Sequence, residues 1–328
     1  MKISIYAICK NEAKFIERWY NSISDADEIV VLDTGSTDGS IELLKLLDVT
    51  VYEAVIKPWR FDMARNLALL HVSEDSDVCL SLDMDEVMLS GWKQGIEKAW
   101  IDGVTEIRYP YVFNWEDVEC TIPRISMYNF KIHARHGYCW HYPVHEIVAA
   151  NEDVEAKMVY SDDIVCHHYA DPYKERNYQV LLDKACEEYP NEERFSHQRG
   201  RELMFAGRFE EAITELERHL TMVSNNQVRA LSYRYIARCL KMMKKTNDEI
   251  LVCMLHSVAE SPYQRESWIW LAQVWLDMGD NAQAYACAQT GLRITDRKSS
   301  FETEEGCWGD IPQNIVKTAL ARMQQVKT

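Results

Sequence analysis

The sequence predicts two domains of different class, an α/β domain with a mostly parallel, doubly wound sheet and an all-α domain of helical repeats. In the first third of the chain, short apolar segments alternate with amphipathic ones, which is typical of alternating strands and helices. From residue 191 onward only helical patterns remain. The 328 residues suffice for about two domains. We therefore expect an α/β domain over 1–170, a linker helix over 171–190 and helical repeats over 191–328.

Composition limits the classes of function. The formal net charge of −16 opposes the basic surface that nucleic-acid binding needs, so we do not expect nucleic acid as a partner. No apolar run approaches the ~18 residues of a membrane span. The first nine residues suit a strand better than a signal peptide. The ten cysteines form no Cys-x-x-Cys pair, so we expect free thiols, no zinc ribbon and a cytoplasmic location.

Four apolar segments have the composition of buried strands. We expect these strands at 3–9, 27–33, 49–55 and 78–82, with helices between the first three and over 62–71. Polar residues follow three of the strands, and ligands of doubly wound sheets bind beyond the carboxyl ends of the strands. Because all three polar clusters fall at the same edge of the predicted sheet, a ligand site is favoured over three unrelated solvated turns. The residues are Asn11, Glu12, Asp33, Ser36, Asp83 and Asp85.

The chemistry of these residues suits a metal ion and a nucleotide. A hard divalent cation prefers oxygen ligands and keeps substrate phosphate oxygens and waters. Asp85 could bind it directly, and Asp83 could do so directly, through water or by contacting ribose. Asp33 could accept hydrogen bonds from a base or ribose. Arg65 could pair with a phosphate through its planar guanidinium, the alternative being a surface arginine.

Four segments resemble glycosyltransferase family 2, the inverting enzymes of the GT-A fold, in identity, order and spacing. They are residues 7–12 (AICKNE), 29–40 (IVVLDTGSTDGS), 61–66 (FDMARN) and 82–86 (LDMDE). The resemblance implies a GT-A domain, a nucleoside-diphosphate sugar donor, most commonly a UDP-sugar, and Mn²⁺ or Mg²⁺. It places Asp33 near the base, and Asp83 and Asp85 near ribose, phosphate and metal.

Three further segments resemble a branch of that family that carries tetratricopeptide repeats behind the catalytic domain. They are residues 122–124 (IPR), 140–146 (WHYPVHE) and 165–169 (VCHHY). The branch includes peptide S-glycosyltransferases of the sublancin type. A peptide or protein side chain is therefore one acceptor class, while a glycan, a lipid-linked sugar and a small molecule remain open.

The middle of the chain is expected to supply acceptor chemistry. An inverting transfer needs a base that takes the acceptor proton. Glu146 is the candidate base, with His145 as the second choice and a structural ion pair as the alternative. In GT-A enzymes a late histidine often completes the metal site. Adjacent strand residues point to opposite faces, and we expect His168 in this role rather than His167, unless it is a core histidine.

Residues 105–118 alternate as in an antiparallel strand that extends the sheet. Aromatic residues are dense there and around residue 140. They could form a sugar-stacking wall or simply belong to the core. They are Tyr109, Tyr111, Phe113, Trp115, Tyr138, Trp140 and Tyr142.

The last third repeats a helix–turn–helix pattern. Gly207, Lys244 and Gly279 occupy equivalent turn positions, spaced by roughly the 34 residues of a tetratricopeptide unit. Residues 315–326 suit a capping helix. The repeats could dock a peptide or protein acceptor, form a homodimer interface or only support the first domain.

Two rival functions share these features. A catalytically inactive scaffold would use the repeats for protein contacts, but it would not need to retain Asp83, Asp85 and His168 together. A nucleotidyltransferase would want a glycine-rich, basic loop after the first strand, and residues 7–12 offer none.

Overall fold

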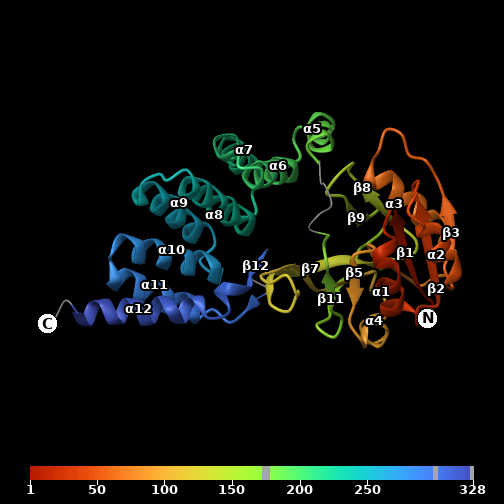
Figure 1. Cartoon of the computed structure of the whole chain (residues 1–328), viewed down its shortest axis with the longest axis horizontal. Coiled ribbons are helices and arrows are strands. Elements are labelled where there is room, and N and C mark those ends of the chain that lie inside the picture. Colours follow the sequence, from red (N-terminus) through yellow and green to blue (C-terminus); the bar gives the residue numbers. More distant parts are fainter. Residues whose placement is uncertain (172–177, 298–301, 326–328) are drawn as a thin grey trace. The chain divides into compact units, whose positions relative to one another are not determined.

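The computed structural model describes residues 1–171, 178–297 and 302–325. The chain divides into two compact units, Met1–Leu181 and Leu182–Thr328 (Figure 1). The division falls in helix α5 (Gln179–Glu188), within the range expected for the linker helix. Residues 172–177 of that expected linker lie outside the described residues.

The first unit begins with the parallel half of a sheet. Its strands lie in the order β3-β2-β1-β4 and all pair in parallel. The bounds are β1 (Ile3–Cys9), β2 (Glu28–Asp33), β3 (Thr50–Glu53) and β4 (Val78–Ser81). These are the four strands predicted from the sequence. Their carboxyl ends share one edge, since Cys9 pairs with Asp33 and Tyr6 pairs with Ser81.

Helices connect these strands and cover the sheet. The helices are α1 (Ala13–Ile23), α2 (Ser40–Leu46), α3 (Phe61–Leu70) and α4 (Trp92–Ala99). Helix α1 buries Ile16, Trp19 and Ile23 on one face, the i, i+3, i+7 spacing that an amphipathic helix requires. Gly39 starts α2 with a φ of 89°, a left-handed conformation that glycine adopts without steric cost.

The same sheet continues past β4 with strands of mixed direction: β7 is antiparallel to both β4 and β6, whereas β10 and β11 pair in parallel with β6. The order continues β4-β7-β6-β11-β5, and β10 also pairs with β6. The bounds are β5 (Glu86–Met88), β6 (Glu106–Trp115), β7 (Pro123–Ala134), β10 (Met158–Tyr160) and β11 (Cys166–His168). A separate hairpin consists of β8 (Tyr138–His141) and β9 (Ile147–Ala150). Because His168 on β11 pairs with Glu86 on β5, this register brings β11 beside the acidic turn that follows β4.

The dense aromatic residues belong mostly to the core. Tyr109, Tyr111, Tyr138 and Trp140 are each at most 6% exposed. Phe113, Trp115 and Tyr142 are only partly buried. Core packing therefore accounts for most of the side chains that could have formed a sugar-stacking wall.

The second unit is an array of antiparallel helix pairs, α6/α7, α8/α9 and α10/α11, with α12 packed on α11 (Figure 1). The turn within each pair contains a residue of positive φ at the equivalent position: 75° at Gly207, 56° at Lys244 and 84° at Gly279. The predicted tetratricopeptide-like repeat is therefore present. The helices are α6 (Glu193–Phe205), α7 (Phe209–Met222), α8 (Asn226–Met242), α9 (Asn247–Glu260), α10 (Arg265–Met278), α11 (Asn281–Leu292) and α12 (Ile311–Gln325).

The chain between α11 and α12 contains a two-residue strand, β12 (Thr303–Glu304), and a 3-10 turn, η2 (Glu305–Cys307). Helix α12 covers the expected capping helix as far as Gln325, and residue 326 lies outside the described part. Of the helices described, none is both long enough and apolar enough to span a bilayer.

Candidate active site

The turn between β4 and β5 carries the acidic residues at the carboxyl edge of the sheet. The backbone N–H of Glu86 donates to the carbonyl of Asp83 at 2.9 Å, and the Glu86 carboxylate accepts from the Asp83 N–H at 2.9 Å. This reciprocal pair fixes a tight turn. The side chains of Asp83 and Asp85 consequently have defined and different surroundings.

The loop after β2 is organised by Asp33. Its Oδ1 accepts the backbone N–H groups of Gly35 and Ser36, each at 2.8 Å, and Ser36 Oγ donates to Oδ2. Asn11, at the end of β1, donates its N–H to Ser36 Oγ at 2.8 Å and accepts the Thr37 N–H at 2.7 Å. Asn11, Asp33 and Ser36, all predicted to bind the donor, therefore form one framework that joins the ends of β1 and β2.

Glu12 lies beside this framework at the start of α1. Its backbone N–H donates to Ser40 Oγ at 2.9 Å, which ties the first loop to α2. Its side chain is 9% exposed.

Arg65, on α3, is the centre of the charge network. Its guanidinium donates to Glu146 Oε1 at 2.6 Å and Ser81 Oγ at 3.1 Å, and lies 2.8 Å from Asp83 Oδ1. It also stacks 4.7 Å from the ring of Trp140. Arg65 is only 5% exposed, and its pairing with a phosphate stays a prediction. Arg65 thus forms ion pairs with two candidate site carboxylates, Asp83 and Glu146.

Lys131, on β7, is a site residue that the sequence analysis missed. Its ammonium group donates to Asp83 Oδ2 and Glu86 Oε1, both at 2.8 Å. Tyr111 also donates to Glu86 Oε1 at 2.8 Å. Lys131 follows Phe130 and precedes Ile132. A lysine inside such an apolar strand is the signal that could have identified it.

These contacts shift the pKa values of Asp83 and Glu86 in opposite directions. Burial alone would raise the pKa of Asp83, but the charges of Arg65 and Lys131 hold it well below its usual range. Burial raises the pKa of Glu86, and Lys131 only partly opposes this. Asp83 is therefore a firmly ionised carboxylate committed to two cations, a different environment from that of a free metal ligand.

We expect Lys131→Met to lower the free energy of unfolding by about 3–5 kcal/mol near neutral pH, because it leaves buried Glu86 without its cation. Losing Lys131 raises the folded-state pKa of Glu86 further above its unfolded value, near 4.3. A raised carboxyl pKa costs stability as the pH rises, so the penalty should shrink toward pH 4. Urea unfolding at several pH values measures both effects.

The matched control is Lys98→Met, since Lys98 pairs with Asp163 on the surface. It should leave the urea midpoint unchanged. Equal losses in the two variants, or a loss in Lys131→Met that is independent of pH, would contradict the role given to Glu86.

Asp85 and His168 face each other at the end of the sheet. His168 Nε2 lies 3.2 Å from Asp85 Oδ2, and its Nδ1 lies 3.0 Å from the carbonyl oxygen of Phe113. Because a carbonyl only accepts, Nδ1 carries a proton. Burial lowers the pKa of His168, but its hydrogen bonds to Asp85 and Phe113 and the charges of Asp85 and Glu86 together outweigh burial, so the net shift of the pKa is upward.

His167 points elsewhere. Its ring packs edge-on against Trp115, with centroids 4.9 Å apart, and its Nδ1 lies 3.3 Å from the Tyr169 hydroxyl. Of the two histidines, His168 therefore faces the acidic turn.

The pair formed by Asp85 and His168 fits a divalent cation. In neutral His168 the proton on Nδ1 leaves Nε2 with its lone pair toward Asp85, and one carboxylate oxygen and one imidazole nitrogen form a usable donor pair. Within the described residues, no three His, Cys, Asp or Glu side chains form a complete metal site. A cation held here would need further oxygens, as Mn²⁺ and Mg²⁺ obtain from phosphates and waters. Asp83 is not part of this pair.

Glu146 and His145 lie on the loop between β8 and β9. Two non-glycine residues of this loop have positive φ, 81° at Tyr142 and 48° at His145. Such conformations cost about 1–3 kcal/mol each and cluster at functional sites. Asn66 holds the hairpin by a reciprocal pair of 2.8 Å hydrogen bonds with the backbone of Trp140. The consecutive residues Arg65 and Asn66 thus fix both the Glu146 carboxylate and the strand before it.

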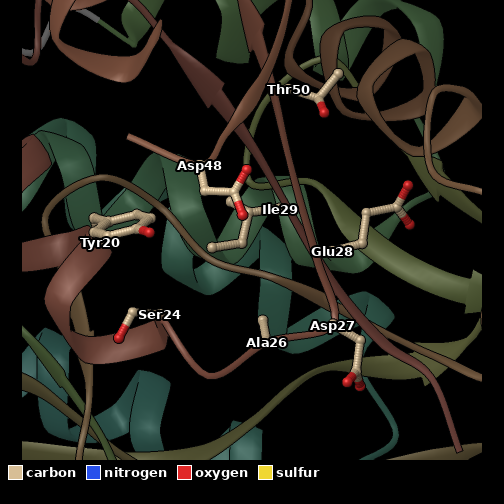
Figure 2. Close-up of a pocket in the computed structure, with 8 residues that line it drawn as sticks. All are labelled: Tyr20, Ser24, Ala26, Asp27, Glu28, Ile29, Asp48 and Thr50. Carbon is tan, nitrogen blue, oxygen red and sulfur yellow. The ribbon is translucent and has the colours of Figure 1, made fainter. Parts of the chain in front are cut away.

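A polar cavity of about 190 Å³ lies at the opposite end of the strands (Figure 2). It is lined by Glu28 and Thr50, the first residues of β2 and β3, with Asp27 and Asp48. Asp27 accepts the Ile3 N–H at 2.8 Å and pairs with Lys93, so its carboxylate has a structural partner. This cavity does not include the predicted site residues.

Comparison with known proteins identifies the first domain. Residues 4–145 match the family model "Glycosyl transferase family 2". An uncharacterized glycosyltransferase of Rickettsia bellii is 29% identical over 184 residues, covering 52% of this chain and 60% of the relative. One of Rickettsia felis is 32% identical over 102 residues, covering 29% and 33%. The chain thus spans 60% and 33% of the lengths of these two relatives, less than two thirds of either.

Among solved structures, the tetratricopeptide domain of Sgt2 from Aspergillus fumigatus matches 42% of this chain and 82% of its own. The sequence identity is 14% and the TM-score is 0.34. The family match lies in the first unit. Its range, residues 4–145, includes Arg65, the acidic turn and the carboxyl ends of β1, β2 and β4. Residues 4–145 of this chain form a glycosyltransferase family 2 domain.

Proposed function

We propose that this protein is a metal-dependent, inverting glycosyltransferase that uses a nucleoside-diphosphate sugar, with a UDP-sugar as the leading donor class. The main support is the pair of Asp85 and His168, 3.2 Å apart, at the carboxyl edge of a glycosyltransferase family 2 sheet. The pair lies at the edge where a doubly wound sheet binds its ligand, which supports a metal site there. The acceptor would be a peptide or protein side chain, or otherwise a glycan.

Donor binding would involve both loops at this edge. The framework of Asn11, Asp33 and Ser36 would receive the nucleoside, with Glu12 supporting it from α1. Asp85 and His168 would hold Mn²⁺ or Mg²⁺, which supplies positive charge to the diphosphate as it leaves. Asp83 would contact ribose or a metal-bound water while Arg65 and Lys131 keep it ionised.

Glu146 would act as the base. It would take the proton from the acceptor hydroxyl or thiol as that atom attacks the anomeric carbon. The bond from that carbon to the diphosphate oxygen breaks on the opposite face, and the electron pair leaves with the nucleoside diphosphate. The hydrogen bond from Arg65 orients Glu146 Oε1. His145 is the alternative base on the same loop, and a thiol acceptor would need less help because it ionises more readily.

The direct test is hydrolysis of a panel of UDP-, GDP-, CDP- and dTDP-sugars by the purified chain, with Mn²⁺, with Mg²⁺ and with a chelator. We expect at least one donor to release its nucleoside diphosphate only when metal is present. Release from no donor under any condition would reject the enzyme and favour a scaffold that acts through its repeats. For an active donor, mass spectrometry of a lysate incubated with isotope-labelled sugar would then identify the acceptor class.

A further inference from the structure

A short acidic stretch of the second unit lies against helices α8 and α10 of the same unit. We call residues 302–305 (ETEE) the acidic segment. The Glu302 carboxylate accepts the hydroxyl of Tyr235, on α8, at 3.0 and 3.2 Å. Glu304 Oε2 accepts from Arg238, on α8, at 3.1 Å and from Trp270, on α10, at 2.9 Å. These side chains hold the segment through its carboxylates, and the backbone N–H of Glu304 also donates to Glu266 Oε1, on α10, at 3.3 Å.

The spacing of the two carboxylates explains this contact. Thr303 and Glu304 form β12, and in extended backbone residues i and i+2 point to the same side. Glu302 and Glu304 accordingly both reach α8, whereas Glu305 pairs with Arg297 at 2.9 Å. Two carboxylates at i and i+2 are thus the feature of the segment that α8 recognises.

The surface that receives the segment carries two arginines, and one of them has N–H groups without hydrogen-bond partners among the described residues. We call Arg234, Tyr235 and Arg238 the α8 clamp. Arg234 is 3% exposed, and its Nη1 donates to Gln264 at 2.9 Å. Its Nε lies 3.4 Å from Glu304 Oε1, yet neither Nε nor Nη2 has a hydrogen-bond partner within the described residues. A buried guanidinium with unused donors costs free energy that better-placed carboxylates would recover.

The charges around Glu302 support the same conclusion. Glu302 is 6% exposed. Burial raises its pKa, and the charge of Arg201, on α6, opposes that shift. Helices α6, α8 and α10 are the first helices of their pairs, and repeat arrays commonly use such a shared surface to bind extended peptides. Arg201, on α6, and Arg234 and Arg238, on α8, thus act on a segment with the chemistry of an acidic peptide.

We propose that the α8 clamp is a docking site for extended peptides of a partner that carry two carboxylates at i and i+2, and that the acidic segment is its built-in occupant. The segment competes at the effective concentration of a tethered ligand, on the order of millimolar. Only a partner that binds more tightly, or is itself held nearby, displaces it. The proposal does not depend on the transferase activity.

The test is binding of a fluorescein-labelled peptide with the sequence ETEEG to the full chain, measured by anisotropy. Glu302→Gln/Glu304→Gln weakens the internal occupant, and we expect it to bind the peptide at least about tenfold more tightly than the unmodified chain. Glu305→Gln is the matched control, because its carboxylate pairs with Arg297 and not with the clamp. It should bind like the unmodified chain, and a QTQEG peptide should bind to none of them.

Adding Arg238→Gln to the double variant should abolish the gained binding. A folded double variant that binds ETEEG no better than the unmodified chain would overturn the proposal. If the double variant does not fold, hydrogen exchange on the unmodified chain decides. A saturating excess of ETEEG, but not of QTQEG, should accelerate exchange of the amides of residues 302–308, and unchanged exchange would likewise overturn the proposal.

Discussion

Asp85→Ala is expected to reduce metal-dependent donor hydrolysis by about 10³-fold, the scale at which removing one group that stabilises charge in a transition state acts. Asp85 Oδ2 faces His168 Nε2, and the alanine variant leaves only the imidazole of this donor pair. The turn should survive, because the backbone carbonyl of Asp85, not its side chain, accepts the Tyr169 N–H at 2.8 Å. Diphosphate release with Mn²⁺ and with chelator measures the change.

Nucleotide binding separates this role from a structural one. In the Asp85→Ala variant, the affinity for UDP in Mn²⁺ should fall to its value in chelator, while the urea midpoint stays close to that of the unmodified chain. The matched control is Asp163→Ala, which removes an exposed carboxylate paired with Lys98. UDP binding by Asp85→Ala that still responds to Mn²⁺ would place the metal elsewhere.

Glu146→Gln is expected to lower donor hydrolysis, with water in place of the acceptor, by about 10²–10⁴-fold. A glutamine oxygen can still accept from Arg65 Nε, so Arg65 and Asp83 should keep their places and donor affinity should change little. The variant therefore removes the proton acceptor but leaves Arg65, its cationic partner, in place. Hydrolysis rates and UDP-sugar affinity are measured on the same preparation.

Two companion variants make this result specific. Glu106→Gln changes another ion-paired glutamate of the same unit, one that contacts Arg108 on β6 and lies outside the charge network. It should leave hydrolysis unchanged. His145→Gln tests the alternative base: a loss of hydrolysis there, with full activity in Glu146→Gln, would transfer the role to His145.

The parallel half of the sheet could be predicted from the sequence because each of its strands is marked by a short local pattern of residues. Each strand is an apolar run of a few residues, and each ends in polar residues whose place at the carboxyl edge follows from topology alone. The repeat turns were equally accessible, since Gly207 and Gly279 mark positions that require positive φ. Even Lys244, without glycine, was found by its spacing.

The charge network was inaccessible because its members are far apart in the chain. The ion pair of Arg65 could not be predicted, because it depends on the β8–β9 loop, which brings Glu146 to α3. Lys131 reaches Asp83 only because β7 runs antiparallel to β4, a pairing that hydrophobic alternation does not specify. The aromatic residues were ambiguous for a related reason, since a sheet covered on both faces buries both sides of a strand.

Arg65 links three parts of the first unit through one planar group: helix α3, the turn after β4 and the loop after β8. A change at Asp83 therefore alters the environment of Glu146, and the reverse also holds, so the effects of substitutions at these two positions should not add. Substitutions that remove the charge at either position are therefore expected to be tolerated best when the other position changes with it.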